Sequence, residues 1–333
     1  MTQPTRNRHV QKVVVLGGGF LGSQIAHRLW QSGRDVTVLT RSEPRGLSAS
    51  LLGSCRLVVG DIQDGPLLRR TMSSAGHVIY ALSALHPYAS NLNPTADVST
   101  SLLPLLSVLK EVGEGVTFTF LSSGGTVYGD ADQTPTPEDA PTEPRSSYGI
   151  VKLAGEKYTM FYQRLRQLQP RILRISNVYG PGQPSYRGQG VIGALLASAE
   201  SGKMLKVFGD GSVVRDYIYV EDMADAVARL LDAPADAHVI NVGTGVGISI
   251  SQVLELVRTV TGRSMAVEYM SGRATDVQRS VLDTRRIRDL IPFAPRPLQK
   301  GILDTWMART QQQQPLDAGP LSVVPTPLLL SPD

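Results

Sequence analysis

Short apolar runs alternate with amphipathic stretches along the first half of the chain. The first run, Val13–Leu16, is continuous and is followed by glycines, which is typical of a strand buried on both faces of a parallel sheet. Apolar residues at helical spacing follow over Phe20–Gln31. Further strands are predicted at Val36–Leu39, Arg56–Val59, Val78–Leu82, Thr117–Leu121 and Ile172–Ile175.

Helices are predicted between these strands, and the most prominent cover Asp97–Glu111 and Ser147–Leu168. Strands that alternate with helices imply right-handed crossovers and an α/β fold with a doubly wound parallel sheet, a Rossmann sheet. We therefore expect an N-terminal extension over residues 1–11 and an NAD(P)-binding Rossmann domain over residues 12–176.

The pattern changes after Ser176, where a loop rich in Gly, Pro, Gln, Ser and Tyr is followed by shorter elements. We expect a smaller C-terminal α/β substrate lobe over residues 177–310, some of whose segments return to the main sheet, and a disordered tail over residues 311–333. Asp222 and Ser249 are predicted near helix N-caps. The predicted helices are Val191–Ser201, Asp222–Leu231 and Ser249–Thr261, and the predicted strands are Lys206–Phe208, Val213–Val220 and Val239–Val242.

Composition narrows the class of protein. A chain of 333 residues with 41% hydrophobic and 19% charged residues suits two packed lobes of a soluble protein. No apolar run has the length of a membrane span, no secretory signal is visible, and the lone Cys55 excludes an intrachain disulfide, so we expect a cytoplasmic protein. A net charge of +4 without a dense Lys/Arg run argues against nucleic-acid binding, and the scattered histidines predict no metal site.

A glycine-rich segment joins the first predicted strand to the first predicted helix. It contains Gly17-x-Gly19-x-x-Gly22 in the strand–turn–helix context that a dinucleotide-binding motif requires. Gly17 permits the tight turn, Gly19 lets a pyrophosphate approach the backbone, and Gly22 allows close packing of helix and strand. Phe20 and Leu21 open the helix whose N-terminus faces the phosphates. The alternative is a glycine-rich turn without a ligand.

The end of the second strand predicts which dinucleotide is bound. An acidic residue there would bind the adenosine ribose 2′-hydroxyl, whereas an arginine accommodates a 2′-phosphate. Because this chain has Thr40 and Arg41 there, we expect NADP(H) to be favoured over NAD(H), unless Arg41 is merely solvated. Asp61 and Ile62, after the third strand, are placed to border the adenine, although Asp61 could instead cap the next helix.

A tyrosine and a lysine, Tyr148 and Lys152, lie four residues apart on one face of a predicted helix. Phenol and amine both have unperturbed pKa values near ~10, and a neighbouring ammonium favours the phenolate. Alone, this spacing is more typical of a surface helix. Downstream of a dinucleotide motif and of the segment Leu121–Gly129, it predicts an acid–base pair.

Together these motifs resemble the extended short-chain dehydrogenases/reductases, specifically the NAD-dependent epimerase/dehydratase family that acts on nucleotide sugars. The resemblance extends from Val13 to about Arg309. Besides the glycine motif it rests on Gly60-Asp61, Ser122–Gly129, Tyr148-x-x-x-Lys152, Asn177–Gln183, Gly209–Gly211 and Arg215–Asp222. It implies a nucleotide-diphosphate sugar as substrate and, as in the family, pairing of the two long helices in a homodimer, although burial in the monomer explains their apolar faces equally.

The resemblance also implies roles for individual residues. Tyr148 would be the acid–base catalyst at a sugar hydroxyl or keto oxygen, and Lys152 would bind the nicotinamide ribose and hold the pKa of the tyrosine down. Asn177 would border the sugar nucleotide, and Arg215 and Arg273 would pair with its diphosphate. The structural alternative for Arg215 is an ion pair with a carboxylate on the same segment, Asp216 or Glu221.

Gly124 departs from the family pattern, because the family usually has its catalytic serine or threonine at this position. Ser123 or Thr126 would then supply the hydroxyl beside Tyr148. Side chains alternate along a strand, so if the strand continues and Gly124 points toward the sugar, Thr126 is the better donor, whereas a bend would favour Ser123. The acidic pair that dehydratases of this family carry is absent, which argues against dehydration.

These residues favour an NADPH-dependent 4-ketoreductase acting on a dTDP-4-keto-6-deoxyhexose in deoxysugar biosynthesis. The first alternative is a nucleotide-sugar 4-epimerase, similar to UDP-glucose 4-epimerase, that retains NAD(H). A second alternative is a non-catalytic, cofactor-binding regulatory protein, which the loss of the hydroxyl at Gly124 would favour and the intact Tyr148 and Lys152 oppose.

Overall fold

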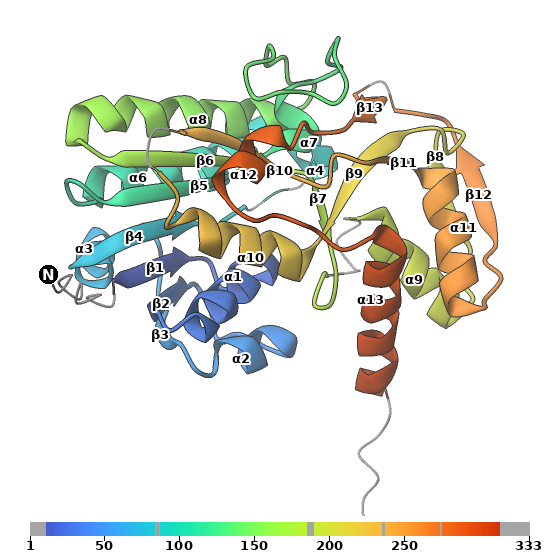
Figure 1. Ribbon diagram of the computed structural model, residues 1–333, viewed down its shortest axis with the longest axis horizontal. Coiled ribbons are helices and arrows are strands. Elements are labelled where there is room, and N and C mark those ends of the chain that lie inside the picture. The colour runs from blue at the N-terminus through green and yellow to red at the C-terminus, as the bar shows by residue number, and fades with distance from the viewer. Residues whose placement is uncertain are drawn as a thin grey trace, which may run out of the picture.

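The computed structural model describes residues 11–83, 85, 87–184, 190–234, 237–273 and 275–313. Figure 1 shows a large lobe, in which a sheet lies between two layers of helices, and a smaller lobe beside it. The last helix, α13 (Leu298–Gln313), continues through the first residues of the predicted tail. The rest of that tail, residues 314–333, and almost all of the N-terminal extension lie outside the described residues.

The main sheet has seven parallel strands in the order β10-β6-β5-β4-β1-β2-β3, which confirms the doubly wound Rossmann topology. One predicted strand was shifted, because β4 begins at Ala75 and ends at Tyr80. A segment from the second half of the chain, β10, returns to the sheet edge beside β6. The strands are β1 (Lys12–Leu16), β2 (Asp35–Thr40), β3 (Arg56–Val59), β4 (Ala75–Tyr80), β5 (Thr117–Ser123), β6 (Gln169–Ile175) and β10 (Val239–Val242).

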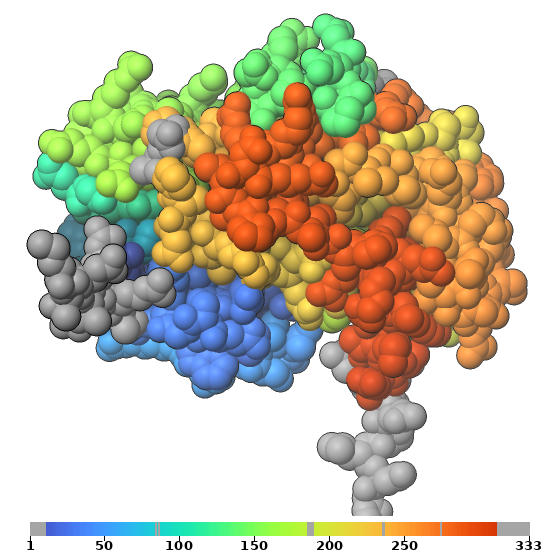
Figure 2. Space-filling model, viewed as in Figure 1, coloured from blue at the N-terminus to red at the C-terminus, as the bar shows by residue number. Residues whose placement is uncertain are grey.

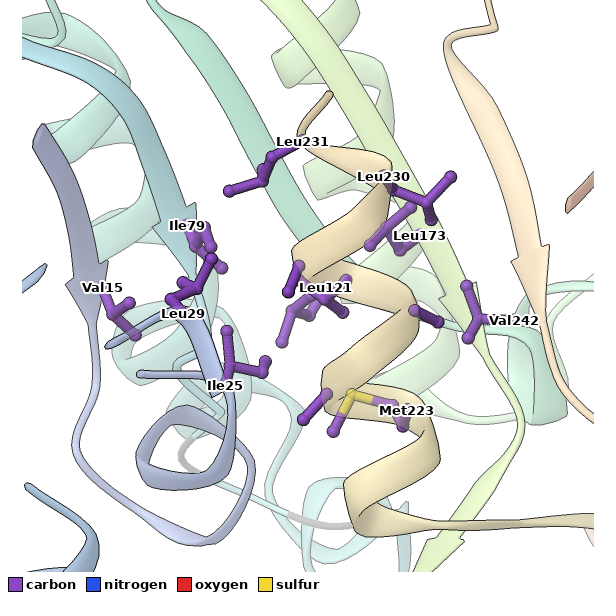
Figure 3. Close-up of a cluster of buried hydrophobic side chains, with 14 of the residues drawn as sticks. Val15, Ile25, Leu29, Ile79, Leu121, Leu173, Met223, Leu230, Leu231 and Val242 are labelled. Atoms are coloured by element: carbon purple, nitrogen blue, oxygen red, sulfur yellow. The ribbon is translucent and has the colours of Figure 1, made fainter. Parts of the chain in front are cut away.

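One face of the sheet is covered mainly by α1 (Phe20–Gln31) and α10 (Val220–Leu230), with α2 (Leu47–Leu52) and α12 (Arg285–Leu290) at its margins. Figure 3 shows Ile25 and Leu29 of α1 and Met223 of α10 pointing into one cluster with strand side chains such as Leu121 and Leu173. Burial of apolar surface stabilises the fold by roughly 25 cal/mol for each Å² removed from water. This cluster therefore fixes the sheet whose strand ends carry the site.

The other face is covered by α3 (Gly65–Met72), α6 (Leu103–Glu111) and α8 (Ser147–Arg166). The predicted helix over residues 97–111 is divided into α5 (Pro94–Asp97), a π-helical turn η1 (Val98–Leu102) and α6. Two local causes are visible. The Asn93 side chain accepts a hydrogen bond from the Ala96 amide and starts the helix early, and Pro104 lacks the amide proton that a regular ladder needs.

The smaller lobe has its own core between α9 (Val191–Ser201), α11 (Ile250–Thr261) and α13. A four-stranded sheet and a two-stranded sheet, β8 with β12, carry these helices. The strands are β7 (Asn177–Tyr179), β8 (Leu205–Phe208), β9 (Val214–Tyr219), β11 (Gly247–Ser249), β12 (Val267–Met270) and β13 (Arg279–Ser280).

Two cap predictions have different outcomes. Ser249 caps α11 in a capping box with Gln252, as predicted. Asp222, predicted near an N-cap, lies in the first turn of α10 but does not cap the helix, which begins at Val220 with Tyr219 at its N-cap. The Asp222 carboxylate instead accepts a hydrogen bond from the Arg296 amide at 2.8 Å, which holds the segment after α12 against α10.

The C-terminal segment joins the two lobes. Figure 2 shows the stretch from α12 to α13, in orange and red, lying across the front of the molecule between them. Arg296 forms an ion pair with Asp222 of α10 at 3.0 Å, and Arg309 forms one with Glu200 of α9 at 2.6 Å. Over the described ranges, no helix is both long and apolar enough to cross a membrane.

Candidate active site

The turn between β1 and α1 forms a cradle for a phosphate-bearing group. The Gly17 amide donates to the Leu39 carbonyl at 2.8 Å, and Gly17 has a φ of +112°, which favours glycine. A Cβ at Gly22 would lie 1.8 Å from the Gly17 carbonyl oxygen, whereas a Cβ at Gly19 would meet nothing within 4 Å. The N-terminus of α1, which includes Phe20 and Leu21, thus adjoins open space, and its first turn carries no acidic residue. These features fit a dinucleotide pyrophosphate.

The end of β2 lies against this cradle. A Cβ at Gly18 would contact the Thr40 side chain at 3.2 Å, so Thr40 occupies the edge where the adenosine ribose of a dinucleotide would lie. Arg41 follows with an exposed side chain. Within the described ranges neither a hydrogen bond nor an ion pair occupies its guanidinium. A second exposed arginine, Arg45, stands on the same loop and was missed in the sequence.

Asp61 is exposed at the end of β3, beside the same edge. It does not cap α3, because the N-cap of that helix is Asp64. The Asp61 carboxylate accepts from the Gln63 amide at 2.8 Å, and Ile62 packs partly against the core under the sheet. Of the two residues expected to border the adenine, Asp61 is exposed at this edge, whereas Ile62 is partly buried against the core.

The first turn of α8, which carries Tyr148, is held by side chains from other elements. Ser146 is its N-cap and accepts from the Gly149 amide at 3.2 Å. The helix α4 (Pro87–Leu92) supplies two more acceptors. Ser90 Oγ accepts from the Tyr148 amide at 3.0 Å, and Asn91 Oδ1 accepts from the Ser147 amide at 2.9 Å. Three orphan amides of the helix terminus are satisfied in this way, which fixes the position of Tyr148.

Two hydroxyl groups lie at the Tyr148 side chain. Ser123, at the end of β5, and Ser83, shortly after β4, lie near enough to the Tyr148 hydroxyl to act on its pKa. Burial raises the pKa of Tyr148, and the two serines oppose that effect. Burial has the largest effect, so the net pKa of Tyr148 is raised, and Lys152 is not among the groups that shift it. Ser83 was missed in the sequence, although its place just after a buried strand was a usable signal.

Lys152 is 7% exposed and lies one helical turn after Tyr148. Its Nζ donates to the Leu121 carbonyl at 2.9 Å and lies 5.6 Å from the centre of the Tyr148 ring. Burial lowers the pKa of Lys152 to about 8, while two carboxylates, Asp97 and Glu156, oppose the effect. The structure thus brings together the predicted tyrosine, lysine and Ser123.

Thr126 does not join this group. The strand β5 ends at Ser123 and turns directly into a short helix, α7 (Gly124–Val127). The Thr126 hydroxyl donates back to the Ser123 carbonyl at 3.4 Å. The preference for Thr126 assumed that the strand continues, and that assumption was wrong.

The predicted substrate residues line the other side of the strand ends. Asn177 begins β7, and its Oδ1 would lie 3.2 Å from a Cβ at Gly125, which places it beside α7. Arg215 is on β9, and the loop of Asp276 is near enough to act on its charge. Arg273, on that same loop, stacks between two aromatic rings, at 3.6 Å from the ring centre of Phe208 and 4.5 Å from that of Tyr88.

The structural alternative for Arg215 is not realised. Asp216 accepts hydrogen bonds from the Thr244 amide at 2.8 Å and from the Gly245 amide at 3.0 Å. Glu221 instead pairs with Arg296. Within the described residues, the Arg215 guanidinium donates to the neighbouring Val214 carbonyl at 2.8 Å, so it stays suited to an anionic ligand.

Comparison with known proteins places this geometry in a family. The family model for the NAD-dependent epimerase/dehydratase family matches residues 13–243. The chain belongs to this family. It is therefore an enzyme of the extended short-chain dehydrogenase/reductase type.

Relatives in this family include epimerases and reductases. A UDP-glucose 4-epimerase of Mycolicibacterium smegmatis is 31% identical, over 89% of this chain and 97% of the relative. A dTDP-4-dehydro-6-deoxy-D-allose reductase of Streptomyces bikiniensis is 28% identical, over 90% of this chain and 97% of the relative. A solved UDP-glucose 4-epimerase of Thermus thermophilus in complex with NAD has a TM-score of 0.80 at 29% identity, with 90% of this chain and 98% of that chain covered.

Gly124, the departure from the epimerase/dehydratase pattern, has a packing explanation. A Cβ there would lie 2.6 and 2.8 Å from the two δ-carbons of Leu282, and 3.2 Å from the Arg174 carbonyl oxygen. Gly124 thus faces Leu282, in the small core beneath α7.

This packing makes a prediction for Gly124→Ser. The added side chain should lower the free energy of unfolding by about 1–3 kcal/mol, because it overpacks the contact with Leu282. Urea denaturation should show the loss in the single variant and little further loss when the change is made in a Leu282→Ala background. Gly19→Ala is the matched control, since its Cβ enters open space. A Gly124→Ser protein as stable as the parent would contradict this account.

Proposed function

We propose that this protein is a nucleotide-sugar oxidoreductase that acts at C4 of the sugar, with Tyr148 as the acid–base catalyst. The observation that carries the proposal is the convergence of Tyr148, Ser123 and Lys152 at the carboxyl end of β5. This is the crevice where open α/β sheets bind their ligands. Family membership and the names of the relatives support the same class of reaction.

The residues around C4 have distinct tasks in this proposal. Tyr148 donates its proton to the forming alkoxide in reduction, or accepts the hydroxyl proton in oxidation. Ser123 holds the phenol in line and shares the hydrogen bond to the sugar oxygen. A bound nicotinamide cofactor supplies or accepts the hydride at C4. Lys152 in its ammonium form binds the cofactor ribose and stabilises negative charge near the phenol.

The cradle of Gly17, Gly19 and Gly22 would hold the cofactor pyrophosphate, with Asp61 beside the adenine. Across the crevice, Asn177 would contact the sugar. Arg215 and Arg273 would bind the diphosphate. To do so, the Arg273 guanidinium would move out of its stacked position between Tyr88 and Phe208.

We infer that the enzyme uses NADP(H) and works as a 4-ketoreductase on a dTDP-4-keto-6-deoxyhexose. The support is the free Arg41 guanidinium at the ribose edge, with Thr40 where a carboxylate would repel a 2′-phosphate. Arg45 adds a second positive charge on the same loop. A reductase exchanges its cofactor at each turnover, which fits an accessible and selective ribose site.

The second candidate is a nucleotide-sugar 4-epimerase that retains NAD(H), as favoured by the epimerase relative at 31% identity and the NAD complex at 29% identity. The intact Tyr148–Ser123–Lys152 arrangement leaves no support for a non-catalytic regulatory protein. One assay separates the remaining functions. Oxidation of NADPH with a dTDP-4-keto-6-deoxyhexose supports the reductase, and conversion of UDP-glucose to its 4-epimer without added cofactor supports the epimerase. If neither activity is detected, the proposal is overturned.

Cofactor selectivity should depend on Arg41. Arg41→Ala is expected to weaken NADPH binding by roughly 10- to 100-fold and NADH binding little, because a charge-assisted hydrogen bond contributes about 1.5–3 kcal/mol. Fluorescence titration with both cofactors measures the change. Glu43→Gln, on the same exposed loop, is the control and should not weaken NADPH binding. Equal affinities of the parent for the two cofactors would exclude the NADP(H) preference.

Turnover should depend on Tyr148 and Ser123 but not on Thr126. Tyr148→Phe should lower turnover by about 100-fold or more with cofactor affinity retained, which is the usual weight of general acid–base catalysis. Ser123→Ala should lower it by about ten-fold, the effect of one lost hydrogen bond. Thr126→Val should have little effect, because this hydroxyl is engaged with the backbone. Steady-state kinetics that rank Thr126→Val below Ser123→Ala in activity would reverse the assignment.

We also propose a homodimer through α8. Ile150, Tyr158, Phe161 and Leu165 are 56%, 41%, 54% and 57% exposed and follow one another at helical spacing. A second copy would cover this apolar stripe. Light scattering on a sizing column should show a dimer for the parent and a monomer for Phe161→Glu with Leu165→Glu. Met307→Glu, at an exposed apolar position on α13, should stay dimeric. A monomeric parent at micromolar concentration would contradict the proposal.

A further inference from the structure

Asp97, a residue that the sequence motifs do not single out, is a completely buried carboxylate next to the acid–base pair. Its side chain is 0% exposed and lies at the end of α5, where the π-helical turn η1 begins. The Ser147 hydroxyl donates to Oδ2 at 3.0 Å, and the Ser101 hydroxyl donates to Oδ1 at 3.1 Å. Two hydroxyl donors do not offset the cost of burying a full negative charge, so a nearby cation is needed.

Lys152 supplies the positive charge that compensates the buried Asp97 carboxylate. Asp97, Lys152 and Tyr148 line the same small internal cavity, of about 10 Å³. No ion pair within 4 Å joins Asp97 to a lysine, arginine or histidine in the described part of the chain. Its charge nevertheless acts on both Lys152 and Tyr148. Asp97 therefore interacts with these two groups by long-range electrostatics across a protein-lined cavity of low polarity, where screening by water is weak.

The other charged and titratable groups near Lys152 already have ion-pair or hydrogen-bond partners. Glu156, one turn further along α8, forms a buried ion pair with Arg174 of β6 at 2.8 Å and accepts from the Ser122 hydroxyl of β5 at 2.5 Å. Tyr80 of β4 lines the cavity, and its hydroxyl donates to the Ser101 carbonyl at 3.4 Å. Asp97 is thus the one carboxylate facing the pair whose charge no arginine neutralises among the described residues.

We propose that Asp97 is a positioning residue of the acid–base centre, which holds the first turn of α8 through Ser147 and keeps Lys152 in its ammonium form. This inference rests on the proposed function of Tyr148 and Lys152. The hydrogen bond to Ser147 couples the carboxylate to the residue directly before Tyr148. The same side chain therefore sets both the geometry and the charge of the site.

The sign of the effect follows from the charge. A negative charge favours the cationic form of Lys152 and disfavours the phenolate of Tyr148, so Asp97 raises the pKa of both groups. Removing the charge should lower both pKa values. The pKa of Lys152, about 8 with Asp97 present, then falls further into the working pH range.

Two neutral variants, Asp97→Asn and Asp97→Ser, test the inference, so that the test still stands if one of them fails to fold. The pH profile of kcat/KM should move to lower pH by about one unit, the scale of a neighbouring charge. The shift has the same direction for reduction and for oxidation. In each reaction, the sloping part of the pH profile follows the pKa of the Tyr148–Lys152 pair. Ser101→Ala and Ser147→Ala keep the charge and each remove one hydrogen bond, so their profiles should stay in place. A purely structural role would lower kcat/KM at all pH values without moving the limb.

A second readout does not require turnover. In protein labelled with [¹³Cζ]tyrosine, the resonance lost in Tyr148→Phe identifies Tyr148, and its titration midpoint should be lower in an Asp97→Asn background. An inactive parent would overturn the proposed function and leave this titration to decide the role of Asp97. An unchanged midpoint, or an unmoved pH profile in an active parent, would overturn the inference.

Discussion

The site depends on how the first turn of α8 is anchored. A helix N-terminus leaves amides without intrahelical partners, and here Ser146, Ser90 and Asn91 accept from them. Two of the three acceptors come from α4, an element more than fifty residues upstream. Tyr148 sits inside this turn, so its hydroxyl is placed by packing and hydrogen bonds from another element. This arrangement gives the pre-organisation that proton transfer needs.

Burial determines the chemistry of the anchored pair. Lys152 donates to a backbone carbonyl of β5 and loses water, which brings its pKa to about 8. Tyr148 is partly buried, and burial raises its pKa, which favours the protonated phenol. The buried ion pair between Glu156 and Arg174 lies one turn further along the same helix and ties α8 to β6. Charge and position are therefore set by the same contacts.

Much of the fold could be predicted because period and turn chemistry are local properties. The apolar runs predicted the seven parallel strands with small shifts at β4, and Ser249 with Gln252 predicted a cap that forms. The prediction failed where a distant contact competed with the local signal. Asp222 has the chemistry of a cap but binds Arg296, a partner that no local window of sequence shows. The helix over residues 97–111 is instead divided for local reasons, the early cap at Asn93 and the missing amide proton of Pro104.

The sequence alone determined the cofactor cradle, the Tyr148–Lys152 pair and the family, because glycine spacing and helical spacing act over a few residues. Only the tertiary structure decided which hydroxyl meets the tyrosine. The strand bends into a helix after Ser123, and Gly124 turns toward Leu282 from a segment more than one hundred and fifty residues away. Tertiary structure also brought Asp97 beside Lys152, since a buried charge is recognised by what surrounds it and not by its neighbours in the chain.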